Sequence, residues 1–199
     1  MVLNYPANYY IQCQLKDFNQ EFVDCVIRCF NMIDHNEEPD GCLSNSVALY
    51  VCAKEYGYDP VLCYGLCSYE QKLFYHAWLE IDGMVIDPSI YGNVNYGFSF
   101  RLLGVSKMLY PYVGFYDDSY KDGISYGKFL FDDDWSKSLL YAMEGKTFEQ
   151  YMDGLPQHAM WKVACLYLNK PFTKNYMFHL KKLIKGKRIE KNFDKLQFA

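Results

Sequence analysis

The amino-acid sequence predicts an α+β protein in which a helix that begins at a cysteine packs on an antiparallel sheet, with a helical elaboration after the sheet. Apolar residues recur at helical spacing early in the chain and again after residue 133, and three strand-like runs lie between residues 60 and 86. The chain has 199 residues, of which 51% are hydrophobic, so it is long enough to bury one full core. We therefore expect one domain over residues 1–199.

Two helices are predicted before the sheet. The run Asp17-Phe18-Asn19-Gln20 resembles a capping box, and apolar residues from Phe22 to Ile33 then recur at helical spacing. The run from Glu37 to Gly41 contains Pro and Gly, which interrupt regular structure, so it is predicted as a turn. A second helix is expected from Cys42 to about Tyr56, with Gly57 as its C-terminal stop.

Three strands are expected next, over Pro60 to Cys67, Phe74 to Ile81 and Met84 to Ile86. The dipeptide Asp82-Gly83 separates the last two runs, and a tight hairpin prefers this dipeptide because both turn positions need positive φ. The hairpin would place the strand of His76 beside the strand that ends at Asp87.

The remaining sequence is predicted as an elaboration, over about residues 96–199, of a core that covers about residues 15–95. Residues Tyr91 to Phe131 are rich in Gly and Tyr and are expected to form further strands or a long loop. Four helices are predicted after it: about Asp134 to Glu144, Thr147 to Met152, Pro156 to Leu168 and Thr173 to Lys185.

Composition narrows the functional classes. A formal net charge of −4 gives no electrostatic argument for nucleic acid as a partner. No apolar stretch approaches the roughly 18 residues of a membrane span, and the N-terminus has neither a basic region nor a long apolar run of a signal peptide. The eight cysteines are therefore expected to be reduced thiols of a cytoplasmic protein.

A thiol, an imidazole and a carboxylate occur in the chain order of a nucleophilic triad. Cys42 follows Gly41 at the expected helix start, His76 lies in the second strand, and Asp87 ends the third. A helix N-terminus offers unpaired backbone N–H groups and a positive dipole end, which lower the pKa of a thiol and can bind an oxyanion. The sequence therefore predicts Cys42, His76 and Asp87 as catalytic residues.

Three motifs carry a family resemblance: Gly41-Cys42-Leu43-Ser44-Asn45-Ser46, His76-Ala77-Trp78-Leu79-Glu80 and Val85-Ile86-Asp87-Pro88-Ser89. Together they resemble the transglutaminase-like superfamily, in which a Cys opens a helix, a His-Ala-Trp run forms a strand and an Asp-Pro-Ser/Thr run ends the next. The resemblance covers roughly residues 39–90, and its short spacing is similar to that of the leader peptidases of lasso-peptide maturation. It implies a papain-like core with Cys42 as nucleophile, His76 as base and acid, and Asp87 as orienting group.

The resemblance implies attack on an amide bond of a peptide or protein substrate through a thioester, without a cofactor. Hydrolysis is the first expectation, by a peptidase, amidase or deamidase; transfer to an amine and a non-catalytic binding or inhibitory module are the alternatives. The Trp or Gln that often completes the family's oxyanion hole has no match, and Asn36 is the nearest amide. Substrate contacts are expected from Tyr75, Trp78 and Tyr91, and part of the Tyr-rich segment from Tyr91 to Tyr126 is expected to line or cover the cleft.

Simpler interpretations of the same residues remain open. Cys42 alone is typical of a small buried apolar residue, His76 of a strand histidine with satisfied hydrogen bonds, and Asp87 before Pro88 of a turn former. The tyrosines of the Tyr-rich segment can instead occupy the solvent face of edge strands. A four-thiolate zinc site from Cys25, Cys29, Cys63 and Cys67 is conceivable, but the four-residue spacing differs from the usual C-x₂-C and no metal is expected.

Overall fold

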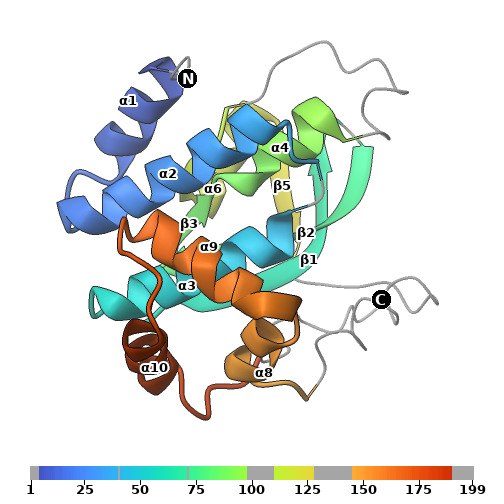
Figure 1. Cartoon of the computed structure of the whole chain (residues 1–199). Coiled ribbons are helices and arrows are strands. Elements are labelled where there is room, and N and C mark those ends of the chain that lie inside the picture. Colours follow the sequence, from blue (N-terminus) through green and yellow to red (C-terminus); the bar gives the residue numbers. More distant parts are fainter. Residues whose placement is uncertain (1–4, 40, 71, 98–109, 128–144, 190–199) are drawn as a thin grey trace.

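A five-stranded antiparallel sheet forms the centre of the molecule, with strand order β4-β3-β2-β1-β5. The structure is a computed structural model that describes residues 5–39, 41–70, 72–97, 110–127 and 145–189 (Figure 1). The strands are β1 (Val61–Tyr69), β2 (Lys72–Ile81), β3 (Met84–Asp87), β4 (Tyr112–Phe115) and β5 (Ile124–Gly127). The helices are α1 (Tyr5–Gln14), α2 (Gln20–Asn36), α3 (Cys42–Glu55), α4 (Ser89–Tyr96), α6 (Tyr116–Ser119), α8 (Phe148–Asp153), α9 (Ala159–Tyr167) and α10 (Lys174–Leu183), with 3₁₀ turns at Tyr120–Asp122 and Pro156–His158.

The two predicted helices before the sheet are confirmed as α2 and α3. The predicted capping box starts at Asp17, but the N-cap of α2 is Asn19, two residues later. The Asn19 side chain accepts hydrogen bonds from the backbone N–H groups of Glu21 and Phe22 at 2.8 and 3.4 Å. Gly57 follows α3 with a φ of 82°, which suits a glycine at a helix end. Helices α1 and α4 were not predicted, because neither segment has a strong apolar period.

The hairpin between β2 and β3 is also confirmed. Asp82 and Gly83 have φ values of 51° and 77°, so both turn positions lie in the left-handed region. The pairing of Ile81 with Met84 and of Leu79 with Ile86 follows from this two-residue turn. The turn therefore fixes which residues of the two strands lie opposite each other.

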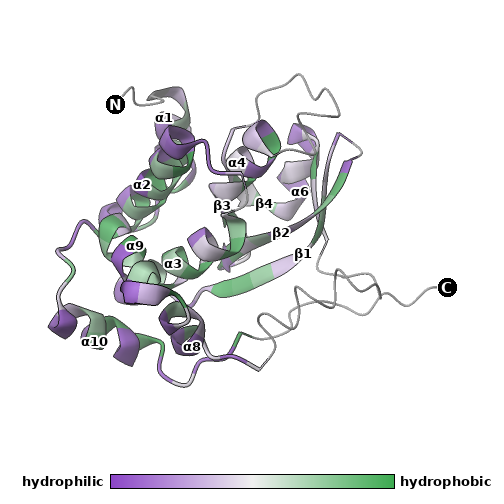
Figure 2. Ribbon diagram, turned by 45° about the vertical axis from the view of Figure 1, so that its right-hand side comes forward, coloured by the Kyte–Doolittle hydropathy of each residue, from purple (hydrophilic) through white to green (hydrophobic). Residues whose placement is uncertain are grey.

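The main core lies on the face of the sheet that α3 covers. In α3 every residue from Asn45 to Ala53 is buried, because the helix is enclosed by the sheet, α2 and α9. Helix α3 and the middle of β1 are apolar over most of their length, whereas α10 has a polar and an apolar side, as a surface helix does (Figure 2). On β2 it is Ala77, Leu79 and Ile81 that face this core.

A second, smaller core fills the other face, because the sheet curls into a half-barrel. β4 and β5 are the two edge strands, yet the rings of Tyr112 and Tyr126 lie 5.7 Å apart between their centroids. Trp78 of β2 and Val85 of β3 are buried in the same cluster. The Tyr-rich segment thus completes the sheet, as one of the two interpretations held, but Tyr112 and Tyr126 point into this core and not to solvent.

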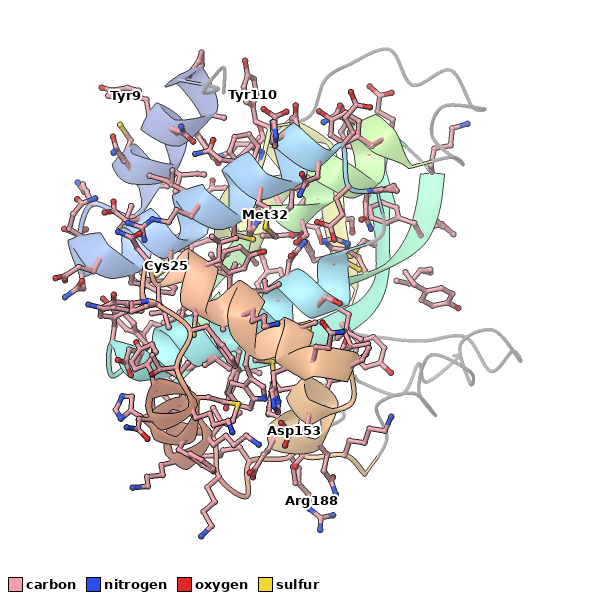
Figure 3. The ribbon with its side chains drawn as sticks, in the orientation of Figure 1. Tyr9, Cys25, Met32, Tyr110, Asp153 and Arg188 are labelled. Carbon is pink, nitrogen blue, oxygen red and sulfur yellow. The ribbon has the colours of Figure 1, made fainter. Side chains whose placement is uncertain are left out.

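The chain after the sheet forms helices as predicted. Thr147 and Gln150 make a capping box at the start of α8, and Thr173 caps α10. The Asp153 carboxylate accepts hydrogen bonds from Trp161 Nε1 at 2.7 Å and Lys181 Nζ at 2.6 Å, which joins α8, α9 and α10 at one point (Figure 3). The predicted helix over Asp134 to Glu144 lies outside the described residues.

Within the described part of the chain, no helix combines the length and the apolar character that crossing a bilayer requires. All eight cysteines are free thiols.

We predict that Gly83→Ala destabilises the hairpin. A Cβ at Gly83 would meet no atom within 4 Å, so the cost arises from the left-handed backbone alone, about 1–2 kcal/mol of unfolding free energy. Urea unfolding monitored by circular dichroism measures it. Gly83→Asn is the matched control, because Asn tolerates the left-handed region, and it should cost less. Equal losses for Ala and Asn would contradict the backbone explanation.

Candidate functional site

Cys42 is the first residue of α3, where the helix meets the edge of β2. The preceding Gly41 supplies no side-chain cap, and the carbonyl oxygen of Gly41 accepts the N–H of Asn45 at 2.8 Å. The backbone N–H of Ala77 lowers the pKa of the Cys42 thiol, and one turn further along Ser46 Oγ donates to the carbonyl oxygen of Ala77 at 3.1 Å. The helix start is therefore fixed against one residue of the strand.

This contact is possible because β2 extends beyond its partner β3. β3 pairs with β2 only from Leu79 to Ile81, whereas β1 pairs with it from Lys72 to Glu80. β3 does not pair with Ala77, so the backbone N–H and carbonyl of Ala77 can contact residues of α3 instead.

His76 faces the second core by strand alternation, on the side of the sheet opposite α3. Its ring nevertheless lies close enough to the Cys42 thiol for each group to shift the pKa of the other, because the sheet is open at this edge. Phe74 contacts the His76 ring edge-on at 5.7 Å between centroids, and Trp78 lies parallel to it at 6.5 Å. His76 is 2% exposed, and two of the groups that bury it are these aromatic rings.

The Asp87 carboxylate is fully buried and accepts four hydrogen bonds. Its Oδ2 lies 2.7 Å from His76 Nε2 and accepts a hydrogen bond from the phenol of Tyr126 at 2.8 Å. Its Oδ1 accepts the backbone N–H groups of Ser89 and Ile90, at 3.1 and 3.0 Å, at the start of α4. The carboxylate can hold a negative charge in the interior because all of its acceptor sites are occupied.

The pKa values of Cys42 and His76 move in opposite directions. Burial raises the pKa of the Cys42 thiol, but the hydrogen bond and charge of His76 together with the N–H of Ala77 outweigh it, and the net pKa is lowered. Burial lowers the pKa of His76, but the charge and hydrogen bond of Asp87 and the contact with Cys42 raise it to about 10. Both directions favour a thiolate beside an imidazolium.

A side chain that the sequence did not single out also contacts the imidazole. Asn93 of α4 places Nδ2 3.0 Å from His76 Nδ1, while its Oδ1 is buried and has no hydrogen-bond partner within the described residues. No signal in the sequence pointed to Asn93, because its position depends on where α4 lies.

Tyr126 belongs to a set of polar aromatic groups in the second core. Burial and the charge of Asp87 raise the pKa of Tyr126 well above its usual range, so its phenol stays protonated and donates. Nearby, Trp78 Nε1 donates to Tyr116 Oη at 2.9 Å, and Tyr116 Oη donates to Glu80 Oε2 at 2.8 Å. These hydrogen bonds hold in place the Trp78 ring, which lies parallel to the imidazole of His76.

Two of the predicted substrate contacts are interior side chains. Trp78 is fully buried in the second core, and Tyr91 is 2% exposed with its hydroxyl donating to Asp34 Oδ1 at 2.6 Å. Both side chains pack the interior, and their role in substrate binding stays a prediction. Tyr75 is half-buried next to His76, and Asn36 is exposed at the C-terminal end of α2. The contacts of the described residues do not join Asn36 to Cys42, so its oxyanion role stays a prediction.

The conceivable zinc site does not form. Cys25 and Cys29 lie in the main core, whereas Cys63 and Cys67 lie in the second core on the other face of the sheet. Among the described residues, no three or more His, Cys, Asp or Glu side chains are arranged so that they could hold a metal ion.

Residues 16–98 match the family model described as the transglutaminase-like superfamily, and all the site residues from Cys42 to Asn93 fall inside this match. The predicted resemblance is therefore confirmed for this part of the chain. The curled antiparallel sheet with α3 packed on it is compatible with an α+β fold of this kind. No match was found among curated proteins or among solved structures.

We predict that Tyr126→Phe lowers the free energy of unfolding by about 1.5–3 kcal/mol, because it removes a hydrogen bond to a buried charged group. Tyr112→Phe is the matched control: this phenol, in the same core, donates to the neutral carbonyl of Phe115, and its loss should cost about 0.5–1.5 kcal/mol. Urea unfolding of both variants gives the comparison. A smaller loss at Tyr126 than at Tyr112 would show that the phenol does not stabilise the carboxylate.

Proposed function

We propose that the protein is a thiol-dependent acyl-transfer enzyme that acts on an amide bond of a peptide or protein, with hydrolysis as the reaction. Cys42 is the nucleophile, His76 the base and acid, and Asp87 the group that orients the imidazole. The observation that carries the proposal is the arrangement of Cys42 at the start of α3, His76 close to it, and Asp87 at 2.7 Å from His76 Nε2, with the pKa of the thiol lowered and that of the imidazole raised. The match to the transglutaminase-like superfamily supports the same assignment.

The nucleophile forms by transfer of the thiol proton to His76. Nε2–H donates a hydrogen bond to the Asp87 carboxylate, so Nδ1 is the nitrogen left for this transfer. The product is a thiolate beside an imidazolium, and Asp87 stabilises the cation.

In the first half-reaction the Cys42 thiolate attacks the amide carbonyl carbon. A C–S bond forms and the carbonyl π electrons move onto oxygen. In this proposal the N–H groups at the start of α3, which no side chain caps, donate to the oxyanion. The oxyanion then collapses, the C–N bond breaks, and His76 Nδ1 gives its proton to the leaving amine. A thioester on Cys42 remains.

In the second half-reaction neutral His76 takes a proton from the acceptor, which attacks the thioester and releases Cys42. Water as acceptor gives a peptidase, amidase or deamidase, and an amine gives a transferase by the same steps. Among the aromatic residues predicted to contact the substrate, Tyr75 is half-buried and next to His76 in sequence, and we assign it a contact with the acyl chain.

A non-catalytic binding module is the second candidate. The observation in its favour is that Asn36, the amide expected to complete the oxyanion hole, is exposed at the end of α2.

We predict that Cys42 reacts with iodoacetamide at pH values well below the roughly 8.5 of an ordinary cysteine. Its thiolate persists below that pH because the Cys42 pKa is lowered, and the paired imidazolium persists until pH rises towards about 10. Peptide mass spectrometry measures the rate at each cysteine, with exposed Cys13 as the internal reference. His76→Gln should move the Cys42 profile to higher pH. Identical profiles for wild type and His76→Gln would rule out the ion pair.

We predict that incubation with a peptide library changes peptides in the wild type but not in Cys42→Ala. New chain termini indicate a peptidase, conversion of Gln to Glu a deamidase, and incorporation of an added primary amine a transferase. Intact-mass measurement of the wild type should detect an acyl adduct on Cys42. A thiolate of low pKa without turnover or adduct would favour the non-catalytic module.

A further inference from the structure

The two ring nitrogens of His76 are contacted by residues of one short stretch of chain. Asp87 Oδ2 lies 2.7 Å from Nε2, and Asn93 Nδ2 lies 3.0 Å from Nδ1. The other oxygen of Asp87 caps the first N–H groups of α4, the helix that carries Asn93. A single carboxylate therefore both binds the imidazole and sets the helix that returns an amide to its other side.

The observed amide orientation suits only one protonation state of His76. An amide NH₂ group donates and cannot accept, so Asn93 Nδ2 pairs with an Nδ1 that carries no proton. Once Nδ1 is protonated, two donors face each other. Asn93 Oδ1, which could accept that proton, is buried without a partner among the described residues.

We propose that Asn93 is a positioning residue of His76 whose side-chain amide turns over as the imidazole gains or loses its proton. Nδ2 donates to the neutral ring, and Oδ1 accepts from Nδ1–H of the imidazolium. The inference rests on the proposed function, because it concerns the same imidazole. It gives the ring a hydrogen bond in both the base step and the acid step.

The proton balance is simple. The S–H bond of Cys42 breaks, an N–H bond forms at His76 Nδ1, and the electron pair stays on sulfur. Turning of the Asn93 amide makes and breaks hydrogen bonds only. The cation is favoured more than the neutral ring, because a hydrogen bond from a charged donor is the stronger of the two.

No other described group replaces Asn93 at Nδ1 except the Cys42 thiol itself. The titratable groups around the imidazole are Cys42 of α3, Asp87 of β3, Tyr126 of β5 and Cys67 of β1. Asp87 binds Nε2, Tyr126 donates to that carboxylate, and Cys67 is a buried thiol whose pKa burial and Asp87 raise well above the usual range. The stabilisation of Nδ1–H thus comes from Asn93 and the thiolate.

Asn93→Leu, which is nearly isosteric but lacks the amide, tests the inference. The pH midpoint of Cys42 alkylation should rise by about one unit, a tenfold loss of thiolate below it. The ¹⁵N chemical shifts of His76 should report a fall in its pKa of similar size. Asn95→Leu is the control on the same helix. Asn95 lies two residues after Asn93, so its side chain leaves the helix about 200° around the axis from that of Asn93, and the pH profile of this variant should match the wild type.

The outcomes separate the inference from the proposed function. A wild-type midpoint at the ordinary value defeats both. A low wild-type midpoint that Asn93→Leu leaves unchanged overturns the role of Asn93 and leaves the triad standing. Equal upward shifts in Asn93→Leu and Asn95→Leu would indicate general loosening of α4 and also overturn it. Asn93→Ala also removes the amide and introduces a smaller side chain, so it replaces Asn93→Leu if the Asn93→Leu variant does not fold.

Discussion

The buried carboxylate of Asp87 is the interaction on which the rest of the site depends. An isolated charge in the interior would cost far more free energy than the fold can supply, so each acceptor position of the carboxylate must be occupied. The four donors come from the imidazole of His76, the phenol of Tyr126 and two backbone N–H groups of α4. One charge therefore joins strands β2, β3 and β5 and the start of a helix.

The curl of the sheet explains how groups from its two faces meet. His76 and Asp87 are directed to the second core by strand alternation, whereas α3 and Cys42 belong with the main core. A flat sheet of full length would separate them. Here β3 ends early beside β2, and the helix start reaches the ring at that open edge. The pairing lowers the thiol pKa, although the partial burial of Cys42 alone would raise it.

Local features made part of this site predictable. The Asp82-Gly83 turn sets the register of β2 and β3, so the proximity of His76 and Asp87 follows from the two-residue loop length. Asn93 and Tyr126 were not predicted as site residues, because no spacing rule relates α4 or β5 to the imidazole. The burial of Trp78 and Tyr91 was not predicted for the same reason: a sequence pattern does not show which aromatic rings face inward.

The sequence by itself determined the elements with local signals: the capped start of α8 at Thr147, the start of α3 at Cys42, the hairpin, and the order of thiol, imidazole and carboxylate. Such signals depend on residues within a few positions of one another. Only the tertiary structure decided that β4 and β5 approach each other around a second core, and that α4 brings Asn93 to His76. α4 contains Gly92 and two asparagines, which are poor helix formers, and its capping by the Asp87 carboxylate and burial against both cores compensate for this. Long-range contacts of this kind depend on the curl of the whole sheet, which no short segment encodes.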